Sequence, residues 1–195
     1  KDKALKQTFD TAAELLEVQA KRNGRVGFTF DIDEKEFSSF VSKFPYEETY
    51  DQKKTIEEVI TDMQSQQPMD RLICGEVGFG KTEVAMRAAF IAALNNKQTC
   101  ILVPTTLLAS QHFASFEKRF QDSGISIAAL SRNINLKEKE KLLQGLGSGE
   151  IDIVIGTHAL LQGNIKFNDL GLLIIDEEHR FGVRQKEKIK TLKEE

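Results

Sequence analysis

The spacing of apolar residues changes once along the chain, close to residue 70. Before that point, apolar residues recur every three or four positions, which is the period of one face of an α-helix. This spacing predicts amphipathic helices over residues 3–22, 33–44 and 49–63. Pro45 ends the second of them, because the residue before a proline disfavours the helical conformation. The first part of the sequence is therefore expected to form a short helical annex.

From Arg71 onward, short apolar runs alternate with longer helical patterns. The predicted strands are 71–74, 99–103, 125–130, 151–155 and 171–175, and the predicted helices are 81–95, 107–121 and 136–146. Several runs are continuously apolar, as in Leu172-Leu173-Ile174-Ile175, which is typical of parallel strands buried on both faces. The expected fold is α/β, with a mostly parallel, doubly wound sheet that binds ligands at the carboxyl ends of its strands.

A glycine-rich segment stands between the first predicted strand and the helix that follows it. Residues 75–82 read Gly-Glu-Val-Gly-Phe-Gly-Lys-Thr, which matches every fixed position of the phosphate-binding loop G-x-x-x-x-G-K-[ST]. In such a loop, backbone N–H groups at a helix N-terminus converge on a phosphate. An ordinary glycine-rich turn is the alternative, but the strand before it and the helix after it favour the phosphate loop. We therefore expect the chain to bind a nucleoside triphosphate.

The residue types within this loop predict a division of roles. Gly75, Gly78 and Gly80 allow positive φ angles and a close approach of the backbone to the phosphates. Lys81 supplies a positive charge for the β- and γ-phosphates, and Thr82 supplies a hydroxyl ligand for Mg²⁺.

A second group of polar residues follows the last predicted strand, in the order Asp176-Glu177-Glu178-His179. At the carboxyl end of a parallel strand, Asp176 can share the Mg²⁺ with Thr82, and Glu177 can polarise the attacking water. An acidic turn that only caps the next helix is the alternative. The intact phosphate loop upstream favours the catalytic interpretation.

Length, net charge, cysteine positions and apolar runs exclude some classes of protein. The chain has 195 residues, 40% of them hydrophobic and 29% charged, which suits one globular domain. Its net charge of −3 argues against a uniformly basic nucleic-acid binder. Cys74 and Cys100 lie in apolar runs without metal-ligand spacing, which predicts two buried, reduced thiols and a cytoplasmic location. No apolar run is long enough to predict a membrane span.

Three further stretches resemble motifs of the superfamily 2 helicases and translocases. Residues 104–109, Pro-Thr-Thr-Leu-Leu-Ala, resemble motif Ia, and residues 156–158, Gly-Thr-His, resemble motif Ic. Both motifs contact the nucleic-acid backbone in that superfamily. Residues 44–52 resemble the Q motif, whose glutamine reads adenine. Tyr50 departs from the usual proline there, and Glu76 replaces a common aspartate in the phosphate loop.

Two longer stretches, 69–90 and 176–187, narrow the resemblance. They are similar to the bacterial transcription-repair coupling factors, which are ATP-driven DNA translocases that displace stalled RNA polymerase and recruit excision repair. Junction branch-migration helicases have a related motor with a similar Arg-Phe-Gly-Val stretch. The sequence Glu-Val-Ala-Met-Arg at 83–87 favours the coupling factors.

The resemblance implies a set of site residues. Nucleotide binding is expected at Gln52, Gly75, Glu76, Val77, Gly78, Phe79, Gly80, Lys81, Thr82 and Glu83; catalysis at Lys81, Asp176 and Glu177; Mg²⁺ binding at Thr82 and Asp176; and DNA contact at Thr105, Thr106, Arg132, Thr157 and His158. His179 is expected to couple hydrolysis to movement on DNA, and no catalytic role is predicted for His112. Two alternatives stay open: Gln52 as only a capping-box partner of Thr49, and the threonines as only helix caps.

The implied organisation is a linker helix and connection over 1–30, followed by the first RecA-like ATP-binding lobe of a motor over 31–195. The chain opens at Lys1 and closes on a Lys/Glu-rich stretch, so we expect a fragment without its second lobe. The expected ligands are ATP, Mg²⁺ and double-stranded DNA. RNA polymerase and excision-repair proteins are expected to bind other parts of the parent protein, and no membrane contact is expected.

Other classes of function explain fewer of these features. A junction branch-migration helicase is the nearest alternative. A P-loop GTPase would need an Asn-Lys-x-Asp guanine reader, and Asn96-Lys97-Gln98-Thr99 lacks the aspartate. A small-molecule kinase leaves the acidic motif and the Gly-Thr-His stretch unexplained. A nucleotide-sensing interaction module predicts a damaged phosphate loop, whereas this loop is intact.

Overall fold

The structure, a computed structural model, describes residues 26–75, 80–130, 134–163 and 165–194. Its elements in chain order are α2 (Glu34–Ser42), α3 (Tyr50–Met63), α4 (Lys81–Leu94), β1 (Gln98–Leu102), α5 (Thr106–Phe120), β2 (Ile127–Leu130), α6 (Leu136–Ser148), β3 (Ile153–Gly156), η1 (His158–Leu161), β4 (Leu170–Ile175), η2 (Glu178–Arg180) and α7 (Val183–Glu194). The predicted helix 3–22 lies outside the described residues, as do Glu76, Val77, Gly78, Phe79 and Arg132. No helix in the described ranges is long and apolar enough to cross a membrane.

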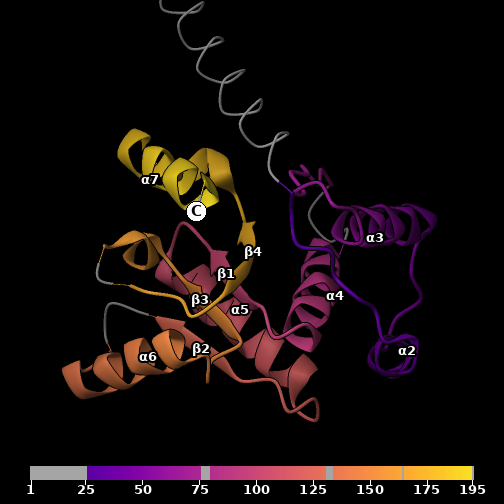
Figure 1. Ribbon diagram of the computed structural model, residues 1–195, viewed down its shortest axis with the longest axis horizontal. Coiled ribbons are helices and arrows are strands. Elements are labelled where there is room, and N and C mark those ends of the chain that lie inside the picture. The colour runs from indigo at the N-terminus through magenta and orange to yellow at the C-terminus, as the bar shows by residue number, and fades with distance from the viewer. Residues whose placement is uncertain (1–25, 76–79, 131–133, 164, 195) are drawn as a thin grey trace, which may run out of the picture.

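Four parallel strands form one sheet in the order β2-β3-β1-β4 (Figure 1). The central pairing places Cys100 beside Val154 on one side and beside Leu173 on the other. All five residues of β1 are buried, because this strand has a strand on each side and helices on both faces. The predicted α/β fold with a parallel, doubly wound sheet is confirmed.

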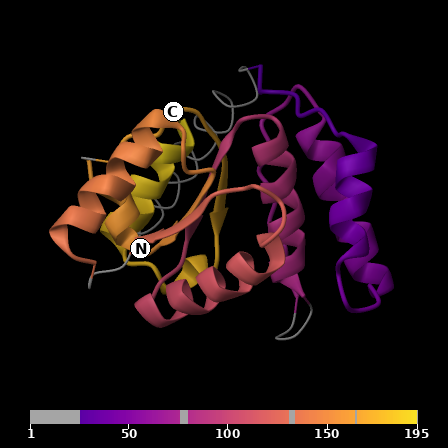
Figure 2. The ribbon, with the colours of Figure 1, turned by 90° about the horizontal axis from the view of Figure 1, so that it is seen from below.

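Helices cover the two faces of the sheet in pairs. One core contains Phe90 of α4 and Phe116 of α5 against Ile101 and Ile155 of the sheet. The other contains Leu146 of α6 and Ile189 of α7 against strand residues of the opposite face. Figure 2 shows α6 and α7 together on one side, with α4 and α5 away from them. The sequence pattern does not predict α7, since most of its residues are charged and Val183, Ile189 and Leu192 are its only apolar residues.

The helical annex packs mainly on the outside of α4 (Figure 2), and its core cluster also includes Leu172 of β4. Ile56, Val59 and Met63 of α3 form a core with Val84 and Ile91 of α4. The annex is therefore a third layer against the helix that follows the glycine-rich loop.

A buried glutamine links several backbone segments at the amino end of the sheet. Gln98, which is 4% exposed, donates from Nε2 to the carbonyls of Leu146 and Ile151 at 3.0 and 2.7 Å. Its Oε1 accepts from the N–H groups of Asn168 and Asp169 at 2.8 and 3.0 Å. All four hydrogen-bonding positions of the amide are thus filled, as a buried polar group requires.

Two predictions around residues 71–74 are wrong. Residues 69–75 form neither helix nor strand, and Leu72 is 83% exposed. The segment instead contacts the annex, where the guanidinium of Arg71 pairs with Glu58 and Asp62 of α3, both at 2.6 Å. Cys74 is consequently exposed rather than buried. Cys100 is buried as predicted, and burial raises the pKa of its thiol to about 12, so it stays protonated.

Candidate functional site

A cavity of about 1010 Å³ opens where the N-terminus of α4 faces the carboxyl end of β4. Its polar end is lined by Lys81 and Thr82 of α4, His112 of α5, and Asp176 with Glu178 after β4. The remainder is lined by residues of β4 and of the segments 59–73 and 163–169, which include both apolar and charged side chains. The structure therefore brings the phosphate-loop residues and the first acidic residue into one cavity.

The loop enters α4 through a glycine that no other residue could replace without strain. Gly80 has φ 76° and ψ 27°, in the left-handed region. A Cβ there would also clash with Nε2 of Gln52. The next residue, Lys81, donates from Nζ to the carbonyl of Gly75 at 2.6 Å. Its ammonium group therefore lies near Gly75, close to the N-terminus of α4, where the helix favours an anion.

Asp176 extends the ladder of β4 by one residue, because its N–H donates to the carbonyl of Leu102 at 2.9 Å. Its Oδ2 lies 2.9 Å from Nε2 of His112. The hydrogen bond from His112 lowers the pKa of this carboxyl most, burial opposes it, and the backbone N–H of Glu177 and the charge of Lys81 add smaller effects. Asp176 is thus held as a carboxylate, the form that binds a cation.

Glu177 adopts an unusual backbone conformation. Its φ of 50° and ψ of 48° lie in the left-handed region, which a non-glycine residue rarely occupies. Its carboxylate accepts from Nη1 of Arg180 at 2.7 Å and is not among the groups that line the cavity. Outliers of this kind cluster at functional turns. The structure therefore places Glu177 beside the metal-ligand candidate but turns its carboxylate toward Arg180.

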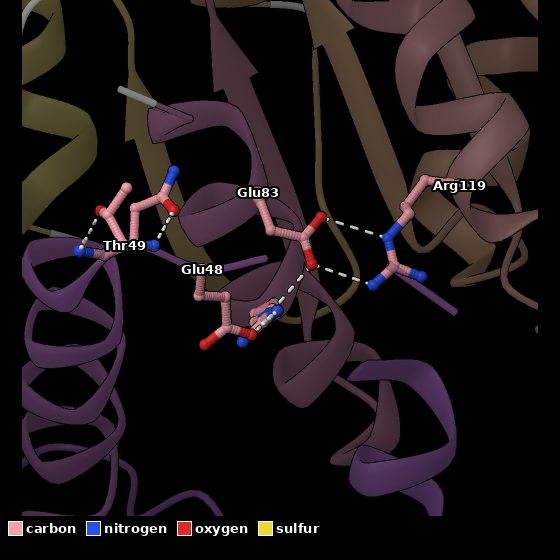
Figure 3. A network of polar contacts seen from close by, with 6 residues as sticks. Glu48, Thr49, Glu83 and Arg119 are labelled. Carbon is pink, nitrogen blue, oxygen red and sulfur yellow. Dashed lines mark hydrogen bonds and ion pairs between the residues drawn. The ribbon is translucent and has the colours of Figure 1, made fainter. Parts of the chain in front are cut away.

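The segment before α3 makes a complete capping box. Thr49 Oγ1 accepts from the N–H of Gln52 at 3.2 Å, and Gln52 Oε1 accepts from the N–H of Thr49 at 2.8 Å (Figure 3). The capping interpretation of Gln52 is therefore confirmed. The same side chain packs against Gly80 of the loop. Gln52 is thus both a helix cap and a neighbour of the phosphate loop.

A buried network of charges ties this segment to α4 and α5 (Figure 3). Glu83, 6% exposed, accepts from Arg87 Nε at 2.9 Å and from Arg119 Nη2 and Nε at 2.9 and 3.1 Å. Arg87 also pairs with Glu48 at 2.5 Å. The Arg119 guanidinium lies 3.8 Å from the ring centroid of Phe40. The carboxylate of Glu83 is therefore engaged away from the cavity, between its two arginines.

The predicted DNA contacts fall at the same carboxyl edge of the sheet. Thr105 caps α5 and accepts from the N–H of Leu108 at 3.2 Å, and Thr157 caps η1. Thr106 is exposed and His158 is half-buried. The capping interpretation of Thr105 and Thr157 is confirmed, and a contact with DNA stays a prediction for all four residues.

Two histidines lie near the acidic motif, and only one of them has a side-chain contact with Asp176 in the described structure. His179, expected to couple hydrolysis to movement, is exposed on η2. His112, to which the sequence assigns no catalytic role, contacts Asp176 directly. No local pattern could have found this contact, because α5 and β4 are joined only through the folded sheet.

The donor set fits a magnesium–nucleotide complex. Thr82 offers a hydroxyl and Asp176 a carboxylate, which are hard oxygen ligands, and Lys81 stands beside them. Within the described ranges, no three His, Cys, Asp or Glu side chains gather as a closed metal site. Mg²⁺ suits this arrangement, because it usually keeps waters and phosphate oxygens as ligands beside one or two protein groups.

Comparison with known proteins agrees with the fold and the motifs. The DEAD/DEAH box helicase family matches residues 49–195. The transcription-repair-coupling factors of Haemophilus influenzae and Escherichia coli are 56% and 52% identical to this chain, each over 99% of it and 17% of their own length. The chain therefore spans about a sixth of the length of these relatives.

A solved structure of RecG bound to a three-way DNA junction is 40% identical, with a TM-score of 0.79. It covers 85% of this chain, which corresponds to 23% of RecG. The predicted resemblance to transcription-repair coupling factors and the predicted RecA-like fold are both confirmed. Because the family match spans most of the sequence and includes Lys81, Thr82 and Asp176, the chain belongs to the DEAD/DEAH box helicases.

Proposed function

We propose that this chain is the first ATP-binding lobe of a double-stranded-DNA translocase of the transcription-repair coupling type. The observation that carries the proposal is the convergence of Lys81, Thr82 and Asp176 on one cavity at the carboxyl edge of the sheet. Identity of at least 52% to two coupling factors supports the choice of family. RNA polymerase and excision-repair proteins would bind other parts of such a protein, which acts in the cytoplasm.

The chain's own groups have distinct tasks in this proposal. Lys81 and the N-terminus of α4 bind the β- and γ-phosphates of ATP, and Gln52 contacts adenine. Thr82 and Asp176 hold Mg²⁺, which neutralises charge on the phosphates. Glu177 orients the attacking water once its carboxylate leaves Arg180. Thr105, Thr106, Thr157 and His158 are the proposed contacts with the DNA backbone, together with Arg132.

A junction branch-migration helicase is the second candidate, and the similarity to RecG favours it. The two candidates differ in substrate rather than in chemistry. Full-length protein that displaces a triplex from linear duplex DNA but does not convert model junctions supports the translocase. The opposite pair of results supports the junction helicase.

The isolated chain is predicted to have negligible ATPase activity that duplex DNA does not stimulate. Arginine fingers contribute about 10³–10⁵ in rate in related NTPases, and we propose that they come from a part of the protein outside residues 1–195, which span about a sixth of the relatives. Its net charge of −3 also predicts weak, salt-sensitive DNA binding. A steady-state ATPase assay of residues 1–195 beside the full-length protein, with and without duplex DNA, tests this. Robust stimulation of the chain alone would contradict the two-lobe mechanism.

Gln52→Ala is predicted to raise the KM for ATP while leaving the KM for GTP almost unchanged, because only adenine loses its contact. The same change also removes half of the capping box, which costs about 0.5–2 kcal/mol of stability. Thr49→Ala is the matched control, since it breaks the cap and leaves the Gln52 amide in place. A thermal melt and competition with both nucleotides separate the effects. Equal selectivity in the two variants would leave Gln52 as a cap alone.

A further inference from the structure

At the carboxyl edge of the sheet, His112 of helix α5 forms a hydrogen bond with Asp176 of the acidic motif. Its Nε2 lies 2.9 Å from Oδ2 of Asp176, and the histidine side chain is only 15% exposed. The Asp176 side chain is 35% exposed, so one part of it faces the cavity. The pair therefore lies half inside the protein and half in the cavity where Lys81 and Thr82 lie.

The packing of α5 on the sheet fixes the side of the helix on which the His112 imidazole lies. Ala109 and Phe116, one turn before and one turn after His112 on α5, are 2% and 0% exposed in the core beneath the helix. His112 therefore belongs to the face of α5 that packs on the sheet. Its ring reaches Asp176 without any movement of the helix.

We propose that His112 is a positioning residue for the cation-binding carboxylate of Asp176. A carboxylate that binds a metal is oriented by hydrogen bonds to its other atoms, and the loss of such a partner typically weakens metal affinity by about 10- to 100-fold. In the described structure, His112 is the side chain that hydrogen-bonds this carboxylate. The inference rests on the proposed function, because it requires Asp176 to hold Mg²⁺.

The position of His112 also distinguishes it from a packing residue. Phe113, its neighbour on α5, packs against the core beneath the helix and is not among the cavity-lining groups. A loss of packing at 113 disturbs α5 without removing a hydrogen bond from Asp176. Phe113→Leu is therefore the matched control for a change at 112.

The test measures metal binding without turnover, in the full-length protein. Mn²⁺ serves as the probe, and its free concentration is followed by electron paramagnetic resonance with a non-hydrolysable ATP analogue present. His112→Leu is expected to weaken the analogue-dependent Mn²⁺ affinity by about 10- to 100-fold. His112→Gln is expected to restore most of it, because the glutamine Nε2 can take the place of the imidazole Nε2. Analogue binding in EDTA should be the same in all variants.

Three outcomes would overturn the proposal. The first is a wild-type Mn²⁺ affinity in His112→Leu, and the second is an equal loss in Phe113→Leu. The third is a failure of His112→Gln to recover affinity while its analogue binding in EDTA is intact. A wild-type protein that binds neither analogue nor Mn²⁺ is a distinguishable result, since it contradicts the proposed function itself and the inference with it.

Discussion

Lys81→Ala abolishes ATP hydrolysis in the full-length protein and weakens ATP binding; this is the largest effect we expect. The Lys81 ammonium lies at the N-terminus of α4 and donates a hydrogen bond to the carbonyl of Gly75 at 2.6 Å. Its positive charge also lowers the pKa of Asp176. A hydrogen bond to a charged group contributes roughly 1.5–3 kcal/mol, which corresponds to about 10- to 100-fold in affinity. The loss in the transition state is larger, because charge develops there.

A second variant separates binding from chemistry. Glu177→Gln keeps the shape of the side chain and is expected to bind ATP normally while turnover stops. Lys118→Ala, at an exposed lysine in the last turn of α5, controls for the loss of a positive charge. Equilibrium binding of a fluorescent nucleotide and a steady-state ATPase assay measure the two effects. Wild-type ATP affinity in Lys81→Ala would falsify the assignment of the phosphate site.

Glu83→Leu is expected to destabilise the domain by about 3–5 kcal/mol, the usual cost of leaving buried charges without their partner. Arg119 loses both hydrogen bonds to a carboxylate, and its side chain is only 9% exposed. Arg87 keeps Glu48 and is less affected. For a domain of this size the loss corresponds to about 6–20 °C in Tm. Urea unfolding followed by circular dichroism measures it.

Two control variants test whether the loss of stability in Glu83→Leu comes from the buried charge network. Glu58→Leu removes an exposed partner of Arg71 and should cost at most about 1 kcal/mol. The double variant Glu83→Leu/Arg119→Leu should recover much of the stability, because an apolar pair can replace a buried ion pair. Equal stabilities for Glu58→Leu and Glu83→Leu would mean that the network is not desolvated, contrary to the low exposure of Glu83 and Arg119.

The elements that the sequence predicts correctly are those with a strong period. The apolar run 151–155 predicts β3, which lies at Ile153–Gly156, and the helical pattern 81–95 predicts α4, which lies at Lys81–Leu94. Continuous apolar runs and long helical faces identify such elements, since burial on a sheet or a helix depends on the spacing itself. The capping boxes are equally visible, because their partners stand three residues apart.

The errors come from contacts between residues far apart in the sequence. The run 71–74 has the composition of a strand, yet it is not part of the sheet, and Arg71 within it pairs with Glu58 and Asp62 of α3. The contact between His112 and Asp176 joins residues 64 positions apart. In the charge network, Glu48, Glu83 and Arg119 belong to three separate segments. Periodicity contains no information on such pairs.

The amide of Gln98 has a mechanical consequence for the domain. It joins the start of β1, the end of α6 and the turn before β4 at the amino edge of the sheet. At the carboxyl edge, Thr105, Thr157 and Glu177 begin separate short turns and helices, and the contact between His112 and Asp176 links two of these segments. A displacement of β1, of the end of α6 or of the turn before β4 is therefore expected to move the other two with it, because one amide group holds all three.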